Sequence, residues 1–173
     1  MNKAATVIDY AYAHCDLGYL LLARKQQGVC AVFLADQTEQ LKAALQQAFP
    51  QAILNLQQVQ QKKRLDSLLQ FIEDPRTPLA LTLAIEGTDF QRAVWQQLQA
   101  IPFGQTADYA SIAARLGRPK AYRAVASACA ANKLAVIIPC HRVIRKNGDP
   151  SDYRWGLWRK QALLAREQKL LAK

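Results

Sequence analysis

The most informative stretch of this chain runs Ile137-Ile138-Pro139-Cys140-His141-Arg142-Val143-Ile144. It sets a thiol beside an imidazole between apolar, β-branched residues, and this setting predicts that both groups are buried. A buried thiol normally has a raised pKa and is inert. A thiol close to a histidine or an arginine can instead lose its proton and become the reactive thiolate. The pair Cys140 and His141 is therefore the candidate chemical centre of the chain.

A relay for the proton of Cys140 can be built from the residues alone. Neighbouring side chains of an extended segment point to opposite faces, so Cys140 and His141 need a turn or a bridging water to communicate. A histidine that acts as a base also needs a partner that fixes its tautomer, and the last predicted helix offers the carboxylate of Glu167. Spacing alone leaves open the alternative that Glu167 is a solvated carboxylate near the end of a helix.

Composition indicates a globular protein without a membrane segment. Of 173 residues 51% are hydrophobic, and no apolar run reaches the ~18 residues that a membrane-spanning helix needs. The N-terminus lacks the basic and apolar regions of a signal peptide, so we expect a cytoplasmic location. Because no two cysteines form a CxxC pair, core thiols are favoured over a zinc site or a disulfide framework, and we expect no metal. The four cysteines are Cys15, Cys30, Cys129 and Cys140.

The charge of the chain is unevenly distributed. Residues 1–85 hold 8 Lys/Arg and 7 Asp/Glu, a net charge of +1, whereas residues 86–173 hold 15 and 6, a net charge of +9. A strongly basic second half favours a polyanion as its partner, although a solvated basic surface would give the same count.

The first half, residues 1–85, has the pattern of a small α/β domain. Short runs of β-branched and apolar residues alternate with turn residues, and amphipathic stretches follow them. The predicted elements are strands at residues 6–13, 19–23 and 28–34, helices at 38–48 and 63–73, and a closing strand at 79–85.

The second half, residues 86–173, is predicted to be helical. Thr88 and Asp89 cap a helix that ends near Ile101, and an amphipathic helix closes the chain over residues 153–173. Between them, helices at 108–116 and 120–131 flank a Gly-Arg-Pro turn, which is a helix-turn-helix arrangement.

These motifs together resemble the O6-alkylguanine-DNA alkyltransferases of bacterial type. The resemblance spans nearly the whole chain. It is carried by Pro139-Cys140-His141-Arg142-Val143, Arg123-Ala124-Val125, Asn132, Gly87-Thr88, Phe90-Gln91, Val94-Trp95, Leu98, Ile101-Pro102, Gly104, Thr106, Tyr109, Tyr153-Arg154-Trp155-Gly156, Asp16-Leu17-Gly18 and Gly28-Val29-Cys30-Ala31-Val32.

The resemblance implies an α+β fold and a direct-reversal DNA repair activity. The first domain would be a small ribonuclease H-like α/β domain with an antiparallel sheet, and the second a helical domain of winged helix-turn-helix type. Such a protein would move one alkyl group from O6-alkylguanine, with O4-alkylthymine as a second candidate substrate, to Cys140. The transfer would be irreversible, would need no cofactor and would occur once per molecule. The implied partner is double-stranded DNA, bound by a monomer through the minor groove with the damaged base flipped out.

The resemblance also assigns roles to single residues. Cys140 would accept the alkyl group, His141 would deprotonate it through a water, and Glu167 would hold His141. Asn132 would link the recognition helix to the thiol segment, and Tyr109 would rotate a phosphate and donate to the guanine ring.

The remaining implied residues contact DNA or the lesion. Arg123 would fill the gap that the flipped base leaves. The backbone carbonyls of Cys140 and Val143 would accept from the guanine amino group, and the N–H of Arg154 would donate to O6. The other implied contacts are Ala124, Ala126, Ser127 and Arg142 with DNA and Tyr153 with the lesion.

Three positions depart from the family pattern. Ala126-Ser127 stands where glycine is common, and Lys133 follows Asn132 in place of proline. Asp152 replaces the glycine before the tyrosine of the lesion pocket, and Asp tolerates a left-handed backbone better than most residues. Its charge and bulk lead us to expect a preference for methyl over benzyl-sized adducts.

Three other functions fit parts of the sequence. The main alternative is a helix-turn-helix protein that binds alkyl lesions without chemistry, although such proteins lack the reactive cysteine. A thiol hydrolase is a second, but its histidine normally comes from a distant part of the chain. A purely structural thiol is the third.

Overall fold

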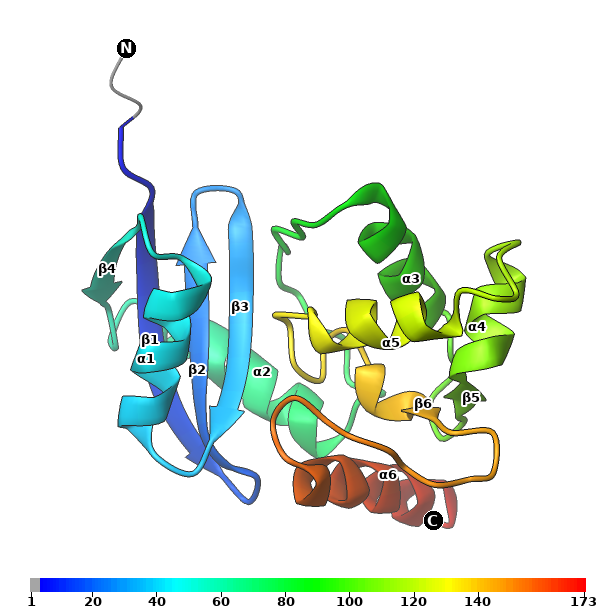
Figure 1. Cartoon of the computed structure of the whole chain (residues 1–173). Helices are drawn as coiled ribbons and strands as arrows, with labels where there is room; N and C mark the ends of the chain where they lie inside the picture. The colour runs from blue at the N-terminus through cyan, green and yellow to red at the C-terminus, as the bar shows by residue number, and fades with distance from the viewer. Residues whose placement is uncertain (1–3) are drawn as a thin grey trace. The chain divides into compact units, whose positions relative to one another are not determined.

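The computed structural model describes residues 4–173, which form two compact units, residues 4–84 and 85–173 (Figure 1). Within residues 4–173, no helix has both the length and the apolar character needed to cross a membrane.

The first unit is built on a four-stranded sheet with the order β3-β2-β1-β4. Neighbouring strands β1, β2 and β3 are antiparallel, in agreement with the expected antiparallel sheet, whereas β4 pairs with β1 in parallel. The strands are β1 (Val7–Cys15), β2 (Gly18–Lys25), β3 (Gly28–Ala35) and β4 (Ile53–Leu56). The first three confirm the predicted strands within two residues. The fourth was not predicted, because its four residues lie in a glutamine-rich segment without a clear period.

Two helices pack against this sheet. Helix α1 (Thr38–Ala48) contacts β2 and β3, and α2 (Lys62–Glu73) contacts β1. In Figure 1 α1 lies in front of the sheet and α2 passes behind it, so both faces are covered. The helices bury Leu41 and Leu45 of α1 and Leu65, Leu68 and Ile72 of α2.

The strand predicted at residues 79–85 does not form. This segment makes a single bridge, Leu83 with Val29, through hydrogen bonds from Val29 N to Thr82 O (2.9 Å) and from Ala84 N to Val29 O (2.8 Å). Alternating apolar residues favour an extended chain, but only one residue of β3 serves as a partner. The crossing is close, since a Cβ on Gly28 would lie 2.5 Å from Thr82 O.

The second unit is helical, with one two-stranded parallel sheet, β5–β6. Its elements are α3 (Asp89–Gln99), β5 (Ala107–Asp108), α4 (Tyr109–Arg115), α5 (Tyr122–Ala130), the 3-10 turn η1 (Cys140–Arg142), β6 (Val143–Ile144) and α6 (Leu157–Leu171). The predicted capping of α3 is confirmed, because the Thr88 side chain accepts from Gln91 N. Helices α3, α4 and α5 contact one another, and Trp95 Nε1 donates to Ala128 O (2.9 Å), which fixes α3 against α5.

Helix α6 begins later than predicted. Residues 153–156 form a loop that ends at Gly156, which has a φ of 101° in the left-handed region. This conformation favours glycine. Because it is not helical, α6 cannot extend towards the N-terminus beyond Gly156. The loop therefore belongs to the site described next.

Candidate active site

Cys140 and His141 lie on one turn of 3-10 helix, η1. Hydrogen bonds from Cys140 N to Ile138 O (2.8 Å) and from Arg142 N to Pro139 O (2.9 Å) close this turn. The segment is therefore not extended, and the neighbouring side chains are not forced to opposite faces. It is preceded by Val136, whose φ of 68° is rare for a β-branched residue and marks local strain held by its surroundings.

A buried carboxylate, Glu167 of α6, lies at the centre of the polar network. Its Oε1 is 2.8 Å from His141 Nε2, and its Oε2 accepts from Gly104 N (2.9 Å). The Arg142 guanidinium donates to both carboxylate oxygens from Nε (3.1 Å each) and to Oε1 from Nη2 (3.0 Å). Since Glu167 is 1% exposed, the alternative of a solvated carboxylate is wrong.

The surroundings of Arg142 differ from the prediction. It was expected to contact DNA, but it is 8% exposed and its Nη1 donates to Ile101 O (2.9 Å) in addition to its bonds with Glu167. Buried charges are kept only when they are paired, and Glu167 needs this cation. Arg142 therefore supports the carboxylate and is not available to DNA.

The environment of Glu167 fixes the tautomer of His141. Burial raises the pKa of Glu167, but hydrogen bonds from His141 and Arg142 outweigh it and lower the pKa to about 2. Burial lowers the pKa of His141 despite its bond to Glu167, so the imidazole is neutral at pH 7. An ionised carboxylate only accepts, so the proton of neutral His141 sits on Nε2. Nδ1, which has no hydrogen-bond partner among residues 4–173, is left as a basic nitrogen.

Cys140 is a buried thiol with polar support. Its side chain is 5% exposed, and Asn132 Nδ2 lies 3.3 Å from Sγ while also donating to Ile138 O (3.0 Å). Burial raises the pKa of Cys140, and the Asn132 hydrogen bond and the charge of Lys160 counteract part of this rise. The thiol is therefore protonated at pH 7 in the free protein and needs a base.

Lys160 of α6 was missed by the sequence analysis. It is 1% exposed, and its ammonium group donates to Val143 O (2.6 Å) and, more weakly, to Asp152 O (3.4 Å). It thus connects the strand after Cys140 to the loop before α6. Its spacing from Leu163 and Glu167, three and seven residues, places all three on one helix face and could have indicated that it is buried.

A cavity of about 400 Å³ opens onto Cys140, a volume within the range of small-molecule sites. Tyr109 OH and Ser151 Oγ are 3.3 Å apart at this cavity, and the buried Tyr153 OH has no hydrogen-bond partner in the described part of the chain. Burial raises the pKa of both phenols, so they remain donors at pH 7. The lining residues are Tyr109, Ala126, Ser127, Cys129, Ala130, Cys140, Ser151, Asp152, Tyr153 and Arg154.

The loop over this cavity differs from expectation at one residue. The left-handed conformation lies at Ser151, with a φ of 67°, and not at Asp152. A hydrogen bond from Ser151 N to Asp149 Oδ1 (2.8 Å) stabilises the turn. Asp152 is exposed at the rim of the cavity, and the Arg154 side chain donates to Asn132 O (2.9 Å).

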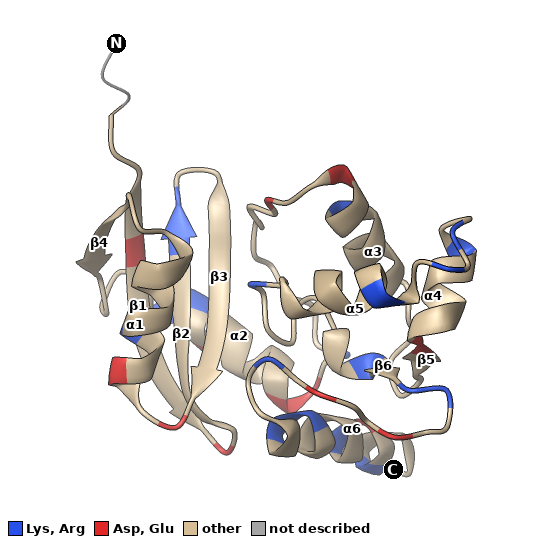
Figure 2. Cartoon of the chain, in the orientation of Figure 1, with Lys and Arg blue, Asp and Glu red and all other residues tan. Residues whose placement is uncertain are grey.

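The predicted DNA-contacting residues of α5 share its outer side. Arg123, Ala124 and Ser127 are exposed, Ala126 is partly buried, and Val125 is fully buried. Lys and Arg colour parts of α4, α5 and α6 in Figure 2. No group of three or more His, Cys, Asp or Glu that could hold a metal occurs among the described residues.

We predict that Glu167→Gln lowers the free energy of unfolding by about 3 kcal/mol at pH 7. The carboxyl has a lower pKa when folded than its usual 4.5, so this stabilisation is complete above that pH and is lost as the pH falls towards 2. Urea unfolding at pH 7 and pH 3 should show a smaller loss on acidification in the variant than in the wild type. Glu86→Gln, which changes an exposed carboxylate of the same unit, serves as the control. Equal acid sensitivity of Glu167→Gln and the wild type would contradict the prediction.

Comparison with known proteins adds independent evidence. Residues 8–85 match the ribonuclease-like domain of 6-O-methylguanine DNA methyltransferase, and residues 89–169 match the DNA binding domain of the same family. A methylated-DNA–protein-cysteine methyltransferase of Mycolicibacterium paratuberculosis is 34% identical over 163 residues, which cover 94% of each protein. A crystal structure of Mycobacterium tuberculosis OGT in complex with DNA superposes with a TM-score of 0.79 at 32% identity and covers 93% of each chain.

A longer relative is more similar in sequence. The bifunctional transcriptional activator/DNA repair enzyme Ada of Escherichia coli K12 is 48% identical over 160 residues, which are 92% of this chain and 45% of that protein. The chain thus spans less than half the length of this relative. With both family domains matched in order and a full-length relative above 30% identity, the chain belongs to the 6-O-methylguanine DNA methyltransferase family.

Proposed function

We propose that this protein repairs DNA by moving an alkyl group from O6-alkylguanine in double-stranded DNA to Cys140, once per molecule. The observation that carries the proposal is a buried thiol on the wall of a 400 Å³ cavity, next to a histidine whose tautomer a carboxylate fixes. The matched relatives are named as methyltransferases of methylated DNA, which agrees with this chemistry. We also infer a cytoplasmic location and action as a monomer, because one chain holds all the proposed groups.

The reaction needs one base and one nucleophile. Nδ1 of His141, through a bridging water, would take the Sγ proton of Cys140, while Glu167 stabilises the imidazolium that forms. The thiolate would attack the alkyl carbon, a C–S bond would form, and the electron pair of the breaking C–O bond would go to O6. The guanine would take up one proton, and the Tyr109 hydroxyl is a donor at the cavity.

The product explains the single turnover. A thioether has no bond that water hydrolyses readily, so Cys140 cannot be regenerated. Asn132 and Lys160 would support the thiolate through a hydrogen bond and a positive charge, which become stronger in a site from which DNA excludes water. Lys160 also holds Val143 O, a carbonyl with a second lone pair for the guanine amino group.

DNA would be bound through the outer side of α5. This side carries small residues and Arg123, which suits close approach to a minor groove with little sequence code. The alkyl group on O6 lies inside the duplex, so the damaged base must be flipped out at a cost of roughly a few kcal/mol. The exposed guanidinium of Arg123 would occupy the vacated space.

The proposal predicts a mass gain of one methylene after incubation with a duplex that contains O6-methylguanine. Intact-mass and peptide measurements should place the group on Cys140, with saturation at one per protein and none in Cys140→Ser. Cys129→Ser is the matched control, because Cys129 lines the same cavity but burial raises its pKa to about 12. Lesion binding without transfer would contradict the proposal and support the non-catalytic alternative.

We predict that Arg123→Ala slows repair of duplex DNA at least tenfold while changing duplex affinity by less than threefold, because its work is to keep the base extruded. Rapid-quench rates with O6-methylguanine in duplex DNA and as the free base test this, since the free base needs no flipping. Arg115→Ala removes an exposed cation from α4 and serves as the control. Equal slowing on both substrates would overturn this role for Arg123.

Asp152 is predicted to limit the size of the adduct. The exposed carboxylate lines the cavity, so the wild type should transfer methyl faster than benzyl, and Asp152→Gly should raise the benzyl rate several-fold with little change for methyl. Asp152→Asn separates charge from bulk. Equal wild-type rates on the two adducts would refute this prediction.

A further inference from the structure

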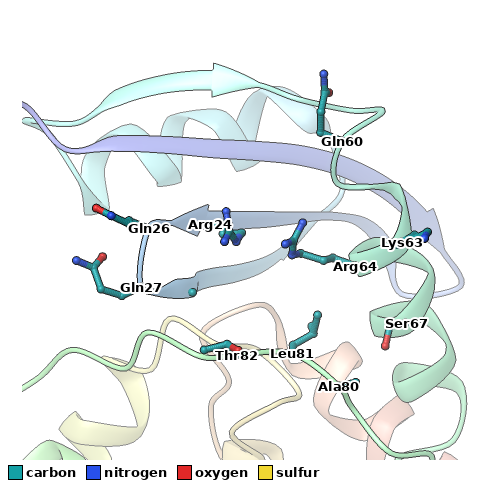
Figure 3. A pocket seen from close by; sticks show the side chains of 11 residues that line it. Arg24, Gln26, Gln27, Gln60, Lys63, Arg64, Ser67, Ala80, Leu81 and Thr82 are labelled. Atoms are coloured by element: carbon teal, nitrogen blue, oxygen red, sulfur yellow. The ribbon is translucent and has the colours of Figure 1, made fainter.

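The first unit contains a second cavity, of about 560 Å³, which the proposed reaction does not use. Figure 3 shows that it lies beneath the end of β2 and beside the start of α2, with Arg24 and Arg64 near its centre. Gln26 and Gln27 of the β2–β3 turn, Ser67 of α2 and Thr82 complete most of its polar lining.

The charged residues that line this cavity are all positive. Residues 1–85 carry 8 Lys/Arg and 7 Asp/Glu, yet three of the cations and none of the acids line it. The cations are Arg24, Lys63 and Arg64, and none of them forms an ion pair within residues 4–173. By contrast, Lys62 in the same helical turn pairs with Asp66 (2.9 Å) and does not line the cavity. A domain that is almost neutral overall therefore gathers unpaired positive charge at one place.

The two arginines of this cavity come from different elements of the unit. Arg24 comes from β2, next to an irregularity of the strand register at Ala23/Arg24, and Arg64 comes from the first turn of α2. Cations in the first turn of a helix oppose its macrodipole, and no acidic residue lies in that turn of α2. Arg64 Nη1 donates to Gln61 Oε1 (3.3 Å), a contact that holds the guanidinium in place but leaves its charge uncompensated.

We propose that this cavity is a binding site for phosphate groups. Two guanidinium groups offer the planar forked donors that fit phosphate oxygens, and glutamine amides and the Ser67 hydroxyl add neutral donors. Ala80 and Leu81 are the lining residues with apolar side chains. The volume admits more than one phosphate, which fits either a free polyphosphate compound or successive phosphodiesters of a DNA strand. The site is separate from the Cys140 cavity and does not depend on the proposed alkyl transfer.

A titration of the ¹⁵N-labelled protein with sodium pyrophosphate at low ionic strength tests the proposal. Amide shifts should saturate and centre on Gln27, Arg64 and Thr82. The variant Arg24→Gln/Arg64→Gln should bind pyrophosphate at least tenfold more weakly, and Arg24→Lys/Arg64→Lys should fall between it and the wild type. The matched control, Lys42→Gln/Lys62→Gln, removes the same charge from exposed positions of the same unit outside the cavity and should change affinity less than twofold.

A second arm separates the two sources of phosphate. If affinity for a lesion-free 12-mer duplex falls in the glutamine variant but not in the control, the site binds the DNA backbone. If only pyrophosphate binding falls, the site takes a free phosphate compound. Shifts spread over the whole surface, or equal losses in the glutamine variant and the control, would overturn the proposal. Methyl transfer to Cys140 from free O6-methylguanine should be unchanged in every variant, so this result is independent of the repair function.

Discussion

The candidate active site depends on the buried carboxylate of Glu167. An ionised group at 1% exposure is costly unless it is paired, and here a guanidinium, an imidazole and a backbone N–H satisfy both oxygens. These bonds join α6 to η1 and to the turn at Gly104, so one side chain sets the geometry of three segments. Gly104 is required there, because its φ is 76° and a Cβ would collide with the Leu171 side chain. The tautomer of His141, and hence the position of the basic Nδ1, follows from the same pairing.

Burial protects the Cys140 thiol from side reactions in the free protein, and it makes the proposed transfer depend on binding of the substrate. A raised pKa keeps Cys140 protonated in the free protein, and protonated thiols react slowly with oxidants and stray electrophiles. The groups that favour the thiolate, Asn132 and Lys160, are already in place but weaker than the effect of burial. Binding of a flipped base would exclude water from the cavity and strengthen these interactions. Such control would suit the proposed single use of the nucleophile, because any other reaction of Cys140 would leave the molecule unable to accept an alkyl group.

Local signals in the sequence were sufficient for much of this architecture. The limits of α1 follow from its amphipathic run and from Pro50, and the start of α3 follows from the Thr88 cap, because both depend on residues within one turn. The pairing of His141 with Glu167 was also predicted, since a catalytic imidazole needs a carboxylate. Contacts between residues far apart in the sequence could not be predicted from these local signals. The strand β4 depends on the edge of β1, residues 79–85 lack a partner strand, and the burial of Lys160 depends on a carbonyl 17 residues away.

The accessible charge of each unit also could not be predicted from the sequence. The second half of the chain has a net charge of +9, but Arg142, Arg159 and Lys160 are among its 15 cations and are all buried. Each of them bonds to a protein carbonyl or carboxylate, and burial keeps all three from the surface that DNA could contact. The first half has a net charge of only +1, yet it concentrates three unpaired cations around one cavity. Counting charge along the sequence therefore overstates the accessible charge of the second unit and hides the cluster of unpaired cations in the first. Since the salt dependence of DNA binding reports only cations that reach phosphates, its slope should be smaller than the 15 cations of the second half would suggest.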